Sequence, residues 1–150
     1  MLDGITNQVP VPDELLGPLA DASQCLTEPT VLRRWLADHG YVFLRDVLDR
    51  DLVLAARREA FTRLEGMGEI LPPAEAGVAT GASQRWELAA DLGAFWKSVS
   101  EGPALRRVTH GPRLRELAGL SFDAPARPHD YLFLRPAGAS NDNQIGRAHV

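Results

Sequence analysis

The sequence predicts an α+β fold in which helices predominate and the few strands lie far apart along the chain. Apolar side chains recur every three or four positions in residues 30–40 and 49–68, which is typical of amphipathic helices. Two β-rich segments of similar sequence, GYVFLRDVL at 40–48 and DYLFLRPAG at 130–138, predict strands. About three strands are too few for an antiparallel sandwich, and their irregular spacing does not suit a parallel α/β sheet.

The first part of the chain is expected to be a lead-in over residues 1–29 followed by a helix. Within the lead-in, a short helix is expected to start at Pro12, since proline suits the first helical position. The helix of residues 30–40 is expected to be capped by Thr30 and to stop at Gly40.

A strand over residues 41–45 and a long helix are expected next. Asp49 is the expected cap of this helix, and an extended loop rich in Gly, Pro and Ala follows over residues 66–83. The apolar stripe of the helix consists of Val53, Ala56, Ala60, Phe61 and Leu64.

The second half is expected to contain a short strand at 84–89, three helices, and a last strand at 130–138. The first of the helices covers residues 92–102, and the other two begin at Pro103 and Pro112. The side chains expected in the core are Phe95, Trp96, Val99, Leu105, Val108, Leu114 and Leu117.

The charge and the cysteine content argue against several classes of function. The chain has 150 residues and a formal net charge of −4, and this disfavours nucleic acid as a partner and a nucleotide- or DNA-binding regulator as the function. The three Arg-Arg pairs lie among acidic residues and are interpreted as solvated helix faces. A single cysteine, Cys25, cannot form an intrachain disulfide. With no basic leader and no long apolar run, we expect a cytoplasmic protein that does not use a membrane.

The four histidines do not form a known catalytic motif. The sequence has no Gly-rich phosphate loop, no Cys pair, no GxSxG and no HExxH. His39 and His110 each precede a glycine at a predicted helix end, where a cationic or hydrogen-bonding side chain is favoured. His129 and Asp130 would point to opposite faces of a strand and are interpreted as the strand entry. His149 is a candidate metal ligand.

Three stretches resemble the N-terminal part of the phytanoyl-CoA dioxygenase family. These are LRRWLADHGYVFLRDVLDRDLVLAARREAFTRL, FWKSVSEGPALRRV and RPHDYLFLRPAGAS, and the resemblance rests on their order and spacing. It implies that residues 30–143 are the N-terminal part of such a domain, with the first strands of a double-stranded β-helix, a cupin-like jelly roll, in truncated form.

The same resemblance implies an Fe(II)- and 2-oxoglutarate-dependent hydroxylase that acts on a small-molecule substrate. Members hold iron with a His-x-Asp pair and a distant His, and the pair is expected close after the AGAS turn at 137–140. Arg85 and Tyr131 occupy positions that in some members lie near the co-substrate. Neither catalytic residues nor metal ligands are expected in this chain itself, so we expect iron and 2-oxoglutarate to bind only the full-length parent.

The last residues, 144–150, are interpreted as foreign to the natural protein. IGRAHV resembles the translation of a common sequencing adapter in which the next codon is a stop, and Gln144 matches the preceding codon. His149 is therefore rejected as a metal ligand.

One alternative function stays open, namely a small helical interaction domain without catalysis. The many predicted helices and the missing catalytic motif favour it. The two FLR-containing strands argue against it, because a helical module has no need of them.

Overall fold

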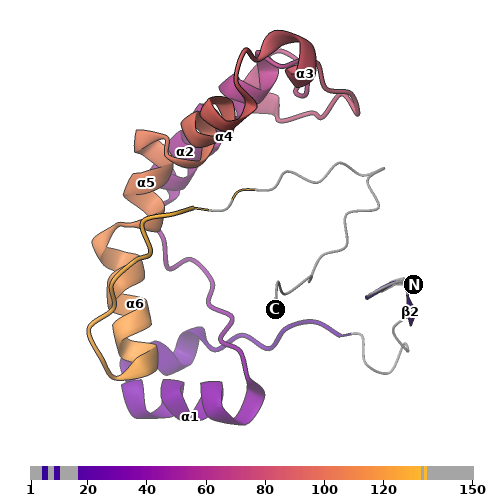
Figure 1. Ribbon diagram of the computed structural model, residues 1–150. Coiled ribbons are helices and arrows are strands. Elements are labelled where there is room, and N and C mark those ends of the chain that lie inside the picture. The colour runs from indigo at the N-terminus through magenta and orange to yellow at the C-terminus, as the bar shows by residue number, and fades with distance from the viewer. Residues whose placement is uncertain (1–4, 7–8, 11–16, 133, 135–150) are drawn as a thin grey trace.

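The computed structural model describes residues 5–6, 9–10, 17–132 and 134, and its helices form two groups that meet at an angle (Figure 1). The first, which we call the α1–α6 group, comprises η2 (Ser23–Thr27), α1 (Pro29–His39) and α6 (Pro112–Phe122). The second, the α2–α5 group, comprises α2 (Arg50–Glu65), η3 (Ala74–Ala76), α3 (Arg85–Leu88), α4 (Leu92–Ser100) and α5 (Pro103–Thr109). In the second group, α5 and α4 lie along α2.

The expected α+β jelly roll is wrong, because the described chain is helical. Its only paired strands are the two-residue β1 (Ile5–Thr6) and β2 (Val9–Pro10), which are antiparallel. The 41–45 segment forms no strand and makes a single bridge, between Phe43 and Asp21. A strand needs neighbouring strands to be stable, and this segment packs against helices instead.

The other two expected strands also differ. Residues 85–88 form helix α3, in which Leu88 N–H donates to the Gln84 carbonyl at 2.9 Å. In the 130–138 segment, residues 130–132 and 134 are described and none of them lies in a strand. Residues 133 and 135–138 lie outside the described residues.

Local sequence signals placed most helix ends correctly. Asp49 caps α2, where its carboxylate accepts from Leu52 N–H at 2.9 Å. Pro103 and Pro112 take the first positions of α5 and α6. Gly40 ends α1 in the left-handed conformation, with φ of 73°, which glycine adopts without strain.

One prediction near the start of α1 is wrong, and another falls partly outside the described residues. Thr30 does not cap the helix, because Pro29 already takes its first turn and Glu28 is the cap residue. The short helix expected from Pro12 is not seen in residues 17–20, and η2 starts only at Ser23; residues 12–16 lie outside the described residues.

The core of the α1–α6 group is small and centres on Leu32, whose side chain is fully buried. Ala22 and Cys25 of the preceding segment complete the buried cluster. Partly buried side chains that pack around it come from η2, α1, the 41–45 segment and α6: Leu26, Trp35, Val42, Leu44 and Leu120. The segment expected to be a strand therefore covers one side of this core.

The expected core of the second half is only partly buried. Val99 and Leu117 are buried, while the other five predicted side chains are half-buried. In the α2 stripe, Ala56 and Leu64 are buried but Val53 is exposed. These helices bury narrow stripes against one another and leave much of their apolar surface uncovered.

Glu59 of α2 accepts hydrogen bonds from the first turn of α5 and so links the two helices. Its Oε2 accepts from Ala104 N–H at 2.7 Å and from Leu105 N–H at 3.2 Å. Its Oε1 accepts from Arg63 Nη2 at 3.2 Å. A carboxylate is well suited to this place, because the first N–H groups of a helix have no partner within the helix.

We expect the stabilising effect of Glu59 to disappear in acid. Burial acts to raise the pKa of Glu59, but the amides of Leu105 and Ala104 and the Arg63 side chain outweigh it and hold the pKa below 4.5, its ordinary value. A lowered pKa in the folded state means that the carboxylate stabilises the fold above the unfolded-state pKa, and that this stabilisation is lost as the pH falls through the folded-state pKa.

Glu59→Gln tests this effect. At pH 7 the variant is expected to lose about 1–2 kcal/mol of unfolding free energy, because a neutral acceptor replaces a charged one. Denaturant titrations from pH 7 to about pH 3 should show the difference from wild type shrinking below pH 4.5. A difference that stays constant over this range would contradict the role of the charge.

Candidate functional site

Arg85, a predicted co-substrate residue, forms a two-point ion pair with Glu69. Its Nε donates to Glu69 Oε1 at 2.6 Å and its Nη2 to Oε2 at 2.5 Å. Both side chains are largely buried, with 23% and 11% of their surfaces exposed. This parallel arrangement is the strong form of an arginine–carboxylate pair.

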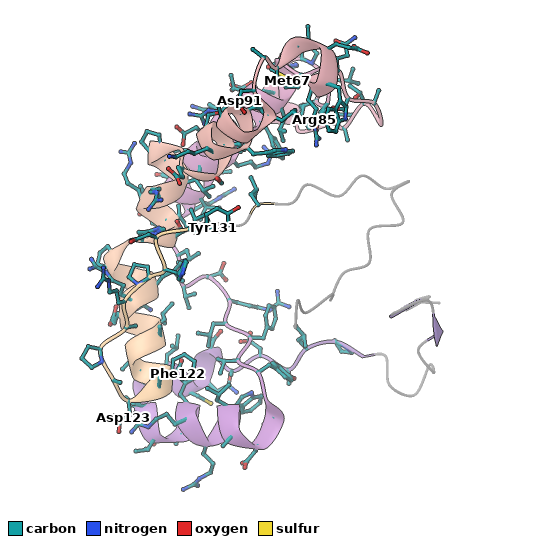
Figure 2. The ribbon with its side chains drawn as sticks, in the orientation of Figure 1. Met67, Arg85, Asp91, Phe122, Asp123 and Tyr131 are labelled. Atoms are coloured by element: carbon teal, nitrogen blue, oxygen red, sulfur yellow. The ribbon has the colours of Figure 1, made fainter. Side chains whose placement is uncertain are left out.

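Two further contacts hold the pair in place. The Arg85 guanidinium lies over the Trp96 ring of α4, 4.5 Å from the ring centroid, where cation–π attraction favours it. Ser83 Oγ donates to Glu69 Oε1 at 2.8 Å and accepts from Arg85 N–H at 3.3 Å. The loop before α3, the helix itself and α4 thus meet at Arg85, which Figure 2 shows near the outer end of the α2–α5 group.

Arg85→Gln is expected to lower the free energy of unfolding by about 1–2 kcal/mol, because the largely buried Glu69 carboxylate loses two charge-assisted hydrogen bonds. Denaturant unfolding measures the effect. Arg58→Gln is the matched control: its pair with Glu75 is 3.6 Å long and more than half exposed, so its loss should stay within about 0.5 kcal/mol. Equal losses in both variants would show that the Arg85–Glu69 pair stabilises the fold no more than the exposed Arg58–Glu75 pair does.

Tyr131, the second predicted residue, lies beside α5 and far from Arg85 (Figure 2). Its side chain is 64% exposed, and its backbone N–H donates to His129 Nδ1 at 3.2 Å. The structure does not bring the two predicted residues together. Arg85 is paired with Glu69, whereas Tyr131 is mostly exposed.

Two side chains contact the segment that carries Tyr131, Arg106 of α5 and His110, the residue that follows this helix. His110 is at the end of α5, as predicted, and His39 ends α1 with its Nδ1 3.1 Å from the Trp35 carbonyl. His149 lies outside the described residues. Within residues 17–132, no three His, Cys, Asp or Glu side chains gather in a way that could hold a metal ion.

The interpretation of the Arg-Arg pairs as solvated faces is wrong for Arg33 and Arg106, which are half-buried. The first member of each pair donates to the backbone carbonyl of a segment distant in sequence: Arg33 to Leu120, Arg57 to Glu75, and Arg106 to Asp130. Arg57 nevertheless stays exposed, as do the second members Arg34, Arg58 and Arg107. Neighbouring helical positions lie about 100° apart, so the two arginines of a pair point in different directions.

Comparison of the sequence with known protein families and curated proteins, and of the fold with solved structures, finds no match. In the described part of the chain, no helix has both the length and the apolar character that a membrane crossing requires.

Proposed function

We propose that this chain is the N-terminal portion of an Fe(II)- and 2-oxoglutarate-dependent hydroxylase of the phytanoyl-CoA dioxygenase type. The order of elements from residue 29 to residue 65 carries the proposal. A helix ends at Gly40, the segment GYVFLR follows, and a helix capped by Asp49 begins soon after. These elements coincide with the first of the three stretches that resemble the family, LRRWLADHGYVFLRDVLDRDLVLAARREAFTRL.

The described residues do not fit the metal or its co-substrate. They contain no cluster of metal-binding side chains, and the Arg85 guanidinium is already paired with Glu69. Fe(II) and 2-oxoglutarate would thus depend on residues beyond those described, in a longer parent protein with a small-molecule substrate. A cytoplasmic location also remains a proposal, supported by the single, buried Cys25.

The uninterrupted reading frame of the natural gene tests the proposal. We expect a His-x-Asp codon pattern soon after Ser140 and a further His codon far downstream. The full-length protein should then release succinate from 2-oxoglutarate in the presence of Fe(II), and the 150-residue chain is the matched control, expected to stay at background. A frame without His-x-Asp, or turnover by the short chain, would overturn the proposal.

A helical binding module is the second candidate, and the observed fold favours it more than the sequence did. The main objection was the pair of expected strands, which the described residues do not form. Large apolar side chains are also exposed on α3 and at the end of α6, with Trp86 80% and Phe122 70% exposed, and exposed apolar surface is typical of binding sites. A natural reading frame that lacks the His-x-Asp pattern would favour this candidate.

A further inference from the structure

Arg106 and His110 hold two successive backbone carbonyls of the segment that follows α6. Arg106 Nη2 donates to the Asp130 carbonyl at 2.6 Å. His110 Nε2 lies 3.0 Å from the His129 carbonyl and also 3.1 Å from Arg106 Nη1. The same imidazole nitrogen therefore faces a hydrogen-bond acceptor and a hydrogen-bond donor.

The proton on His110 decides which of these two contacts forms. A guanidinium only donates and a carbonyl only accepts. Nε2 without a proton can accept from Arg106, and Nε2 with a proton can donate to the His129 carbonyl, but it cannot do both. The two contacts thus exclude each other.

The opposite side of the imidazole favours a proton on Nδ1. Nδ1 lies 2.9 Å from Thr109 Oγ1, and that hydroxyl donates to the Leu105 carbonyl at 3.1 Å. The hydroxyl has a single hydrogen, so while it donates to Leu105 it can only accept from His110. In the neutral imidazole the single proton is then on Nδ1, which leaves Nε2 free to accept from Arg106.

We propose that proton uptake by His110 is a switch that releases the Asp130 carbonyl from Arg106. The imidazolium has N–H groups at both positions, so Nε2 turns from an acceptor into a like-charged donor 3.1 Å from the guanidinium. Arg106 is displaced, and its hydrogen bond to the Asp130 carbonyl breaks. His110 then donates to the His129 carbonyl. The segment stays attached to the end of α5 through this bond while the Asp130 carbonyl is released.

Two other titratable side chains, Glu101 and His129, contact Arg106 or the 129–131 segment, and neither opposes the release of the Asp130 carbonyl. Glu101, at the end of α4, lies 3.7 Å from Arg106 Nη2 and offers the guanidinium a place to move to. On the segment itself, His129 accepts from Tyr131 N–H through Nδ1, and a proton on that nitrogen would remove the acceptor. Both histidines therefore loosen residues 129–131 when they are protonated.

The test is an NMR titration of the whole 150-residue chain from about pH 8 to 5, which follows the Asp130 carbonyl carbon and the ring signals of His110 and His129. The Asp130 signal is expected to titrate with the midpoint of the His110 ring. In His110→Gln, whose amide both donates and accepts but takes up no proton, this titration should be lost. In His129→Gln it should persist.

Two results would overturn the switch. An Asp130 carbonyl signal that does not move in wild type would show that Arg106 keeps its bond at every pH. A titration that persists in His110→Gln and is lost in His129→Gln would assign the effect to the other histidine. Neither result depends on the proposed function, because the readout concerns only contacts among residues 101–131.

Discussion

Leu32→Ala is expected to lower the free energy of unfolding by about 3 kcal/mol, within the range of about 2–5 kcal/mol found for buried leucines. Leu32 is fully buried and shares its cluster with Ala22 and Cys25. A core with so few members has little other apolar contact to compensate for the cavity. Denaturant unfolding followed by circular dichroism measures the loss.

Val31→Ala is the matched control, since Val31 is the neighbouring residue on α1 and is 38% exposed. It should cost clearly less than Leu32→Ala, because removing a partly exposed side chain leaves no closed cavity. Similar losses in both variants would show that the cluster around Leu32 is not a packed core.

Gly77→Ala is expected to cost about 2–4 kcal/mol, from strain of about 1–2 kcal/mol for a left-handed backbone and from overpacking of about 1–3 kcal/mol. Gly77 has a φ of 65°, and an added Cβ would lie 2.5 Å from the Phe61 ring and would also meet the Arg57 guanidinium. That guanidinium holds the loop to α2 through the Glu75 carbonyl at 2.6 Å. The substitution therefore strains the backbone and pushes against the attachment of the loop.

Gly81→Ala separates the two causes. Its φ is 75°, but an added Cβ would meet nothing within 4 Å, so only the backbone strain of about 1–2 kcal/mol should remain. The difference in unfolding free energy between the two variants measures the steric contribution at Gly77. No difference would mean that the loop moves away from Phe61 at no cost.

Helix ends could be predicted from the sequence because their causes are local. The Asp49 cap and the prolines that open α5 and α6 act within one helical turn. The strands could not be predicted, since β-propensity describes how a residue fits a sheet and not whether a sheet exists. In the GYVFLR segment, Val42 and Leu44 are partly buried against η2 and α1, so these apolar side chains are covered without any sheet.

The candidate site was less predictable than the helices. Arg85 was predicted to lie near the co-substrate, and the structure pairs it with Glu69 and places it over Trp96. These partners follow from a loop path that no sequence period reveals. Arg106 and His110 were interpreted from their helix positions alone. Their contacts join residues 19 and 24 positions apart, and these contacts depend on how the chain leaves α6.

The division into two helical groups has a consequence for the order of folding. Every element of the α2–α5 group comes from one continuous stretch, so its contacts close short loops. The α1–α6 group must instead join segments on either side of that stretch, and its bond between Arg33 and the Leu120 carbonyl spans 87 residues. Loop closure costs more entropy as the loop grows. The continuous group should therefore form first. The segments that flank it, which are joined where Arg113 Nε of α6 donates to the Val47 carbonyl at 3.1 Å, should then come together.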